Sequence, residues 1–298
     1  MTLSNDAIAR LRQLDDRPDF AATRYERLEE IGRGGMGIVF RAHDRELDRD
    51  VAVKVTAWST ESDAARLRRE ARTLASLEHA GIVPIHDVGR LPDGRVFLVM
   101  RLARGERLDV HARTLAIADR LRLFDRICDT IAFAHARGIV HRDLKPANIM
   151  VGAFGQVQIL DWGLAGGSEP GGTDGYMAPE QSTQKSHPRS DVYALGAILA
   201  GLTTEGGWHL SGKGASHLLP PLQSIVQRAT AADPDARYPD AGALAADVRR
   251  LADGQAVLAH REGVVERAGR LARTYRTPIV LILTYLAVRL LLLFWPAR

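Results

Sequence analysis

Cysteine and lysine are scarce in this chain of 298 residues. Cys128 is the only cysteine, which excludes an intrachain disulfide framework and a zinc site built from cysteines. Four of the 40 basic residues are lysine, so arginine supplies most of the positive charge and each lysine stands out. Residues 1–17 are polar and have no apolar stretch, so we expect no secretory leader.

The overall balance of residues is that of a globular protein. Hydrophobic residues make up 46% and charged residues 26% of the chain, which disfavours a mainly disordered protein. The length suits one large two-lobed domain with a tail. The net charge of +4 is modest and the arginines are dispersed, so we expect no nucleic-acid partner.

Two regions of different periodicity follow an N-terminal extension at residues 1–24. Between residues 25 and 102, β-branched and apolar runs are bounded by glycine, aspartate and proline, which indicates a mostly antiparallel sheet. One helix interrupts it at residues 64–77, where apolar residues recur every three or four positions. Between residues 103 and 253 the apolar period is helical. The sequence therefore predicts an α+β fold, with a small β-rich N-lobe and a larger α-rich C-lobe.

The C-terminal end is strongly apolar. Residues 279–295 reach the lower length limit for crossing a bilayer, and Arg289 stands near the end of this run, where it can snorkel. Arginines are more frequent before the run than after it, which places the bulk of the chain in the cytoplasm. We therefore predict a basic juxtamembrane segment at 254–277 and a single-pass transmembrane helix at 278–296 in the cell membrane. The alternatives are a core helix and a helix that lies in one leaflet.

A glycine-rich segment lies in the first predicted hairpin. Residues 32–39 fit the pattern G-x-G-x-x-G-x-V, and glycine lets the backbone approach phosphate oxygens because no Cβ obstructs it. The dinucleotide-binding form of this pattern is followed by a helix, whereas a β-type run containing Lys54 follows here. Taken alone, the segment is equally well explained as a plain glycine-rich turn.

Further motifs follow in order along the chain. A half-buried lysine such as Lys54 needs a carboxylate partner to stay charged, and Glu70 lies on the side of its predicted helix that can face this lysine. Taken alone, Glu70 is equally a solvated helix charge. The remaining motifs are Val-Ala-Val-Lys at 51–54, His-Arg-Asp-Leu-Lys-Pro-Ala-Asn at 141–148, Asp-Trp-Gly at 161–163 and Tyr-Met-Ala-Pro-Glu at 176–180.

In this order and spacing, the motifs resemble those of bacterial Hanks-type (eukaryotic-like) serine/threonine protein kinases. The resemblance assigns residues 25–253 to a kinase domain and implies the two-lobed protein-kinase fold. It also implies ATP and Mg²⁺ as cofactors and transfer of the γ-phosphoryl group to serine or threonine hydroxyls of proteins, including the kinase itself. A homodimer for autophosphorylation and a signalling role at the membrane fit this expectation.

The resemblance also implies roles for individual residues. Asp143 would accept the proton of the substrate hydroxyl, and Lys145 would neutralise charge on the γ-phosphate. Lys54, oriented by Glu70, would hold the α- and β-phosphates.

Metal and nucleotide ligands are implied in the same way. Asp161 and Asn148 would bind Mg²⁺, for which hard oxygen ligands are suitable. The nucleotide would contact the glycine loop, Lys54, the strand before it and the backbone of the hinge, a set made up of Ile31, Gly32, Arg33, Gly34, Gly35, Met36, Gly37, Ile38, Val39, Ala52, Arg101 and Ala103.

Other residues resemble structural elements of the family. Glu180 would pair with Arg237, Asp191 would brace the catalytic loop, and Thr173 would contact Asp143. Trp162 replaces the usual phenylalanine, so we expect altered packing rather than lost chemistry. Residues 163–178 are short and glycine-rich.

Within residues 163–178, Ser168 is the main hydroxyl left for activating phosphorylation once Thr173 contacts Asp143. Arg142 could pair with a phosphate there or form a structural ion pair. The alternative to an active enzyme is an ATP-binding pseudokinase scaffold at the membrane.

Overall fold

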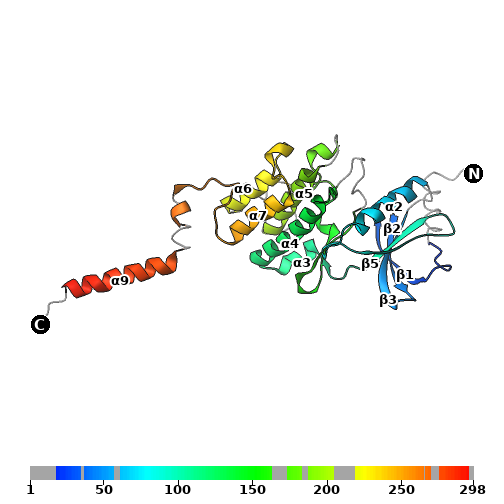
Figure 1. The fold of residues 1–298 in the computed structure, drawn as a ribbon, viewed down its shortest axis with the longest axis horizontal. Helices are drawn as coiled ribbons and strands as arrows, with labels where there is room; N and C mark the ends of the chain where they lie inside the picture. The colour runs from blue at the N-terminus through cyan, green and yellow to red at the C-terminus, as the bar shows by residue number, and fades with distance from the viewer. Residues whose placement is uncertain are drawn as a thin grey trace, which may run out of the picture.

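A β-sheet lobe, a helical lobe and a projecting C-terminal helix follow one another along the molecule (Figure 1). The computed structural model describes residues 18–34, 37–56, 61–162, 173–182, 187–204, 219–264, 266–269 and 275–294. The described residues have the β-rich N-lobe and the helical C-lobe that the sequence predicts. The boundaries of the kinase domain at 25 and 253 stay a prediction.

Five antiparallel strands form the N-lobe sheet in the order β1-β2-β3-β5-β4. Helix α2 covers one face, where Leu67 and Ala71 pack with Leu98. The predicted hairpin at Asp93 and Gly94 joins β4 to β5. The elements are β1 (Tyr25–Gly34), β2 (Gly37–Asp44), β3 (Arg49–Thr56), α2 (Glu61–Ala75), β4 (Ile85–Arg90) and β5 (Val96–Arg101).

The C-lobe is built around α4 (Ile117–His135). Its apolar stripe, which includes Ile127 and Cys128, is fully buried, and burial raises the pKa of the Cys128 thiol well above its usual value. Gly138 follows α4 with a φ of 72°, a conformation that commonly ends helices. The other helices are α3 (Leu108–His111), α5 (Pro188–Thr203), α6 (Pro220–Ala229) and α7 (Ala241–Ala252).

A small three-stranded sheet carries the connection between the lobes. Its order is β6-β7-β8, with antiparallel pairing throughout. The residues between β7 and β8 form a short 3₁₀ turn at Ala153–Gly155. The strands are β6 (Glu106–Arg107), β7 (Ile149–Val151) and β8 (Val157–Ile159).

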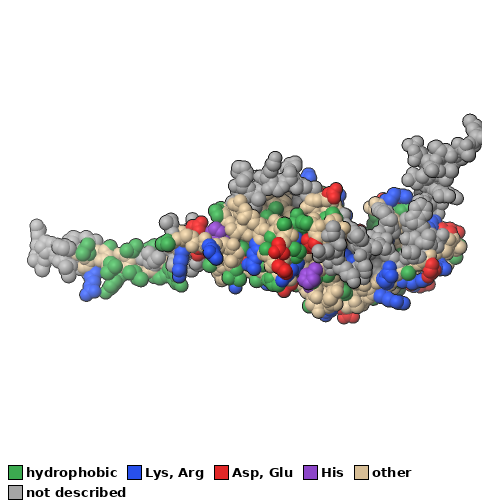
Figure 2. Space-filling view, turned by 90° about the horizontal axis from the view of Figure 1, so that it is seen from above, with side chains coloured by type: hydrophobic (Ala, Val, Ile, Leu, Met, Phe, Trp, Pro, Cys, Tyr) green, Lys and Arg blue, Asp and Glu red, His purple; other side chains and the backbone are tan. Residues whose placement is uncertain are grey.

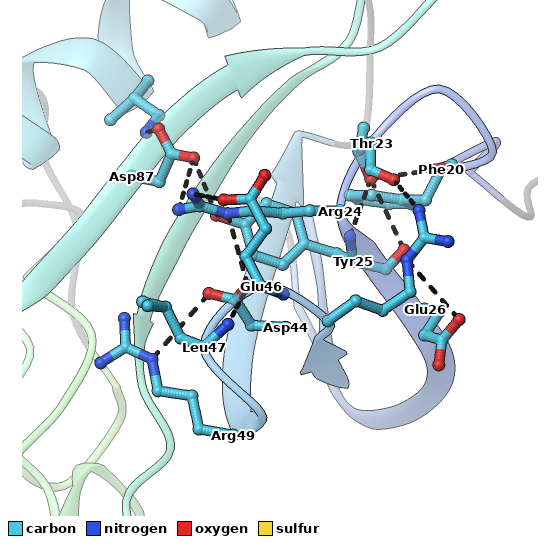
Figure 3. A network of polar contacts seen from close by, with 12 residues as sticks. Phe20, Thr23, Arg24, Tyr25, Glu26, Asp44, Glu46, Leu47, Arg49 and Asp87 are labelled. Atoms are coloured by element: carbon cyan, nitrogen blue, oxygen red, sulfur yellow. Dashed lines mark hydrogen bonds and ion pairs between the residues drawn. The ribbon is translucent and has the colours of Figure 1, made fainter.

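The end of the predicted N-terminal extension packs on the N-lobe. Phe20 is buried, and its ring centroid lies 5.1 Å from that of Phe97. Next to it, the hydroxyl of Tyr25 donates to Asp87 at 2.7 Å, and Arg24 joins Asp87 and Glu46 in the same polar network (Figure 3). Burial and the hydrogen bond to Asp87 raise the pKa of Tyr25 to about 12. The lobe therefore includes residues before β1.

The segment after α7 is bound to the C-lobe by a buried carboxylate. Asp247 is fully buried and accepts the backbone N–H of Leu258 at 2.7 Å and of Ala259 at 2.9 Å. The hydroxyl of Tyr238 donates to the same carboxylate at 2.8 Å, and Val257 is buried in the core. The first part of the predicted juxtamembrane segment is thus packed on the kinase body rather than free.

The C-terminal helix α9 (Arg276–Phe294) projects away from the C-lobe, at the end of the molecule opposite the N-lobe (Figure 1). Arg289 stands inside this helix. Among the described residues, none of the helices has the length and apolar character needed to cross a membrane. The prediction of a transmembrane helix at 278–296 is therefore not supported.

A matched pair of substitutions on α4 tests where the core lies. Ile127 is fully buried, so Ile127→Ala should lower the free energy of unfolding by about 2–5 kcal/mol through lost burial and a residual cavity. Ile117→Ala makes the same chemical change at a position that is 49% exposed and should cost much less. Denaturant unfolding of both variants measures the difference, and equal losses would contradict the assigned core.

Candidate active site

The glycine-rich segment is the end of the hairpin between β1 and β2. Gly34 pairs with Gly37 across the hairpin. Gly37 has a φ of +141°, and a Cβ there would lie 2.0 Å from the carbonyl oxygen of Val55, so only glycine fits. Ile31 is about half exposed, Ile38 is buried, and Arg33 pairs with Glu30. Gly35 and Met36 lie outside the described residues.

The sheet register places the expected nucleotide contacts on one face. Val39 pairs with Lys54, and Met100 pairs with Ala52. Because directly opposed residues share a face, Val39, Ala52, Lys54 and Met100 point to the same side of the sheet. The hinge residue Ala103 follows β5 and is half-buried. Strand pairing thus places the predicted residues Val39, Ala52 and Lys54 on one face, together with Met100.

Lys54 connects the two lobes. Its side chain is buried, and its Nζ lies 3.0 Å from Oδ1 of Asp161, which follows β8 in the C-lobe. Burial would raise the pKa of Asp161, but the charge and hydrogen bond of Lys54 lower it below its usual value. Asp161 therefore stays ionised at neutral pH. Glu70 lies on α2, and its side chain is outside the described residues.

Three side chains fix the carboxylate of Asp143. Oδ1 accepts the hydroxyl of Thr173 at 2.7 Å, and Oδ2 lies 2.7 Å from Nζ of Lys145. Lys145 also donates to the Thr173 hydroxyl at 2.7 Å. The amide of Asn148 donates to the Asp143 carbonyl at 2.9 Å and to Oδ2 at 3.3 Å. The predicted contact of Thr173 with Asp143 is thus present, and the carboxylate has one fixed orientation.

The oxygen donors suit Mg²⁺ in number and type. The amide nitrogen of Asn148 is taken by Asp143, which leaves its carbonyl oxygen as a ligand, and Asp161 supplies an ionised carboxylate. The backbone N–H of Leu160 donates to the backbone carbonyl of Asn148 at 2.8 Å. This bond keeps Asn148 adjacent to Asp161, the residue after Leu160. In the described part of the chain, no three His, Cys, Asp or Glu side chains form a metal cluster. Mg²⁺ commonly uses one or two protein ligands with phosphate oxygens and water.

Asp191, on α5, braces the segment that carries Asp143. It is buried, and it accepts the backbone N–H groups of His141 and Arg142, each at 2.8 Å. Nε2 of His135 lies 2.8 Å from the same carboxylate. Burial would raise the pKa of Asp191, but the hydrogen bond and charge of His135 lower it. The brace that the resemblance implies is present.

Trp162 fills the space below the site. Its side chain is buried, its indole N–H donates to the carbonyl of Ile159 at 3.1 Å, and its ring centroid lies 4.6 Å from that of His141. Nε2 of His141 lies 3.0 Å from the carbonyl oxygen of Leu160. The larger ring is accommodated with its polar atom satisfied, and Asp161 beside it still reaches Lys54.

A buried ion pair anchors the segment after Thr173. Two nitrogens of Arg237 donate to the two oxygens of Glu180 at 2.8 and 2.9 Å, as the resemblance implies. The hydroxyl of Ser190 donates to Glu180 at 2.8 Å. Arg237 also donates to backbone carbonyls, including that of Ala231 at 2.7 Å. The pair therefore ties this segment to α5 and to the loop before α7. Ser168 lies outside the described residues.

Two contributors to the site were missed in the sequence. His135 binds Asp191, and its position on the apolar stripe of α4, four residues after Ile131, is a signal that a buried polar partner exists. Gln181 donates to the carbonyl of Arg142 at 2.8 Å and accepts the N–H of Ala178 at 2.9 Å. No sequence pattern identified Gln181.

Comparison with known proteins gives a consistent result. Residues 25–237 match the family described as Protein kinase domain. The chain is 34% identical over 278 residues to the serine/threonine-protein kinase PknB of Mycolicibacterium smegmatis, covering 80% of this chain and 44% of that protein. It is 41% identical over 195 residues to the serine/threonine-protein kinase PknA of Mycobacterium tuberculosis, covering 59% of this chain and 45% of that protein. The chain thus matches less than half the length of these curated relatives.

The ion pair of Glu180 predicts a pH dependence of stability. Burial would raise the pKa of Glu180, but Arg237, a backbone N–H and Ser190 lower it below the ordinary value of 4.5. The stability that this carboxylate contributes is therefore complete above pH 4.5 and is lost as the pH falls through the lowered pKa. The difference in unfolding free energy between the wild type and Glu180→Gln should be constant from pH 7 to 5 and shrink at lower pH. A difference that grows on acidification would contradict this.

Proposed function

Because the chain belongs to the bacterial Hanks-type serine/threonine protein kinase family, we propose that it transfers the γ-phosphoryl group of ATP to serine or threonine hydroxyls of proteins. The observation that supports this most strongly is the fixed carboxylate of Asp143, which Thr173, Lys145 and Asn148 hold from three sides. Phosphoryl transfer asks a protein mainly for positioning and for charge neutralisation, and this arrangement supplies both.

Each side chain has a definite task in this proposal. Asp143 accepts the proton of the attacking hydroxyl, with Oδ1 and Oδ2 already oriented by hydrogen bonds. Lys145 lies beside it and offsets negative charge on the transferred group. Lys54 reaches across from the N-lobe to hold the phosphates in line. Mg²⁺, held by Asp161 and Asn148, neutralises charge on the phosphate oxygens when it is bound.

The alternative is a nucleotide-binding scaffold without turnover. It would be favoured by the loss of a residue that performs the chemistry, but Lys54, Asp143, Asn148 and Asp161 are all present and the described contacts bring them into one region. The observations therefore favour an active enzyme. Substrates, a signalling role and a homodimer for autophosphorylation remain parts of the proposal.

Substitution of Asp143 tests the activity. With Mg²⁺ and labelled ATP, the wild-type chain should phosphorylate a generic protein acceptor, and Asp143→Asn should reduce the rate on the order of 10²–10⁴-fold because the proton acceptor is lost. Asp253→Asn, at an exposed position after α7, makes the same chemical change outside the site and should retain the wild-type rate. ATP-dependent thermal stabilisation with no transfer by the wild type would favour the scaffold instead.

We propose further that α9 attaches the kinase to the cytoplasmic face of the cell membrane. Val280, Leu281, Ile282 and Leu283 are consecutive, so they cover the whole circumference of the helix, and each is at least half exposed. Hydrophobic side chains line the described part of this helix (Figure 2). A helix that is apolar all round is normally buried in protein or in lipid. The arginines before α9 suit an anionic leaflet.

A double substitution tests this attachment. Ile282→Asp with Leu286→Asp places two charges on α9 and should move most of the protein from the membrane to the soluble fraction, since each buried aspartate costs about 2.5–3.5 kcal/mol. Leu47→Asp with Ile117→Asp, at exposed positions of the kinase body, adds the same charge and should leave the protein in the membrane fraction. Unchanged membrane association of a chain without residues 278–298 would refute the proposal.

A further inference from the structure

A cavity of about 530 Å³ opens at the edge of the N-lobe sheet, beside the hinge. Its walls come from the end of α2, the connection from α2 to β4, the start of β4 and the last residue of β5. The apolar part includes Leu74, Leu77, Ile82 and Ile85. The volume lies in the range of small-molecule sites, and the lining mixes these apolar side chains with Glu78, His79 and Arg101. We call this space the α2–β4 cavity.

The side chain of one basic residue in the lining has no role in the proposed phosphoryl transfer. Arg101 lines the cavity, and its guanidinium makes no ion pair or side-chain hydrogen bond with the described residues. Its backbone N–H donates to the carbonyl oxygen of Pro84 at 3.1 Å. Side chains alternate along β5, so Arg101 points away from the face that carries Met100 and Ala52. The side chain of Arg101 is therefore separate from the expected nucleotide face.

The charges around Arg101 are unevenly balanced. Burial and then the charges of Arg49 and Arg101 lower the pKa of His86, and the charge of Asp44 opposes them. Arg49 has its nearest carboxylate oxygen on Asp44, at 3.9 Å, and its buried Nε has no hydrogen-bond partner among the described residues (Figure 3). Glu78 is the acidic residue of the lining. Arg101 is the arginine of the lining, and its side chain has no described carboxylate partner.

We propose that the α2–β4 cavity binds an amphipathic organic anion, whose apolar body lies on the leucine and isoleucine side chains and whose carboxylate pairs with Arg101. An arginine fork matches a carboxylate in shape and charge. The unpaired guanidinium and the apolar lining together select this class of ligand over a neutral apolar molecule or a bare inorganic ion.

The position of the cavity gives the ligand a regulatory effect. Its walls include α2, which carries Glu70, and the end of β5, whose backbone continues into the hinge. A ligand that contacts both elements changes the affinity for ATP, and ATP changes the affinity for the ligand by the same factor. This coupling rests on the proposed kinase function, whereas binding to the cavity does not.

Naphthoate is a suitable probe, with the uncharged naphthamide as its isosteric counterpart. Calorimetric titration of the full chain in detergent should show naphthoate binding about tenfold more tightly than naphthamide, as expected for one charge-assisted contact. Arg101→Met should remove this preference by weakening naphthoate alone. Ala75→Trp, at an exposed position of the lining, should fill the cavity and abolish binding of both probes.

Two control variants separate local charge from general charge. Arg90→Met removes an arginine that pairs with Glu61 outside the lining and should change neither affinity. Glu78→Gln removes the opposing charge and should strengthen naphthoate binding. Equal affinities of the two probes, or an Arg101→Met variant that binds like the wild type, would overturn the anion site. Binding that survives Ala75→Trp would place the probe elsewhere.

The coupling has a separate measurement. Saturating naphthoate should shift the affinity for ATP in the wild type and leave it unchanged in Ala75→Trp, as measured by titration with an ATP analogue that is not hydrolysed. Binding without this shift would overturn the regulatory effect and retain the site. A chain that binds ATP but transfers no phosphate would refute the proposed function and leave both titrations interpretable.

Discussion

The buried carboxylate of Asp191 connects the helical core to the residues that would perform the chemistry. Its oxygens accept backbone N–H groups of His141 and Arg142, which immediately precede Asp143. These two donors belong to the backbone and are present whatever the side chains are. The geometry of this turn therefore depends on the ionised carboxylate of Asp191 that accepts them. His135 supplies the charge and hydrogen bond that keep the acceptor ionised in spite of its burial. The positions of Asp143, Lys145 and Asn148 all follow from this one constraint.

In the N-lobe, the sheet presents Lys54 to Asp161 of the C-lobe. Strand register decides which residues share the face of Lys54, and close approach of backbones decides where glycine is obligatory, as at Gly37. The ion pair between Lys54 and Asp161 joins segments that are far apart in the chain. Phosphates that enter between the lobes would meet a cation from one lobe and a metal-binding carboxylate from the other. The site thus depends on how the lobes are held together as well as on its own residues.

The sequence patterns that predicted the fold arise from the burial of one face of a single strand or helix. Alternating β-branched runs predicted the sheet, and the helical period between residues 103 and 253 predicted the helices of the C-lobe, since burial of one face imposes the period. Partners far away in sequence have no such period: the bond of His135 to Asp191 and the packing of Phe20 on Phe97 could not be read from the residues alone. The prediction of a bilayer-spanning helix rested on the hydropathy of the sequence alone, and the described residues give it no support.

The clamp of Asp247 on Leu258 and Ala259 has a consequence for where the enzyme can work. The described body extends to about residue 260, and residues 261–275, of which 264 and 266–269 are helical, connect it to α9. This connection would span roughly 50 Å if it were fully extended, and less where it is helical. With α9 held in lipid as proposed, the kinase domain would stay within a thin layer above the bilayer. Under the proposed attachment, proteins within this layer would meet the kinase domain at high effective concentration, and proteins away from it would meet it rarely.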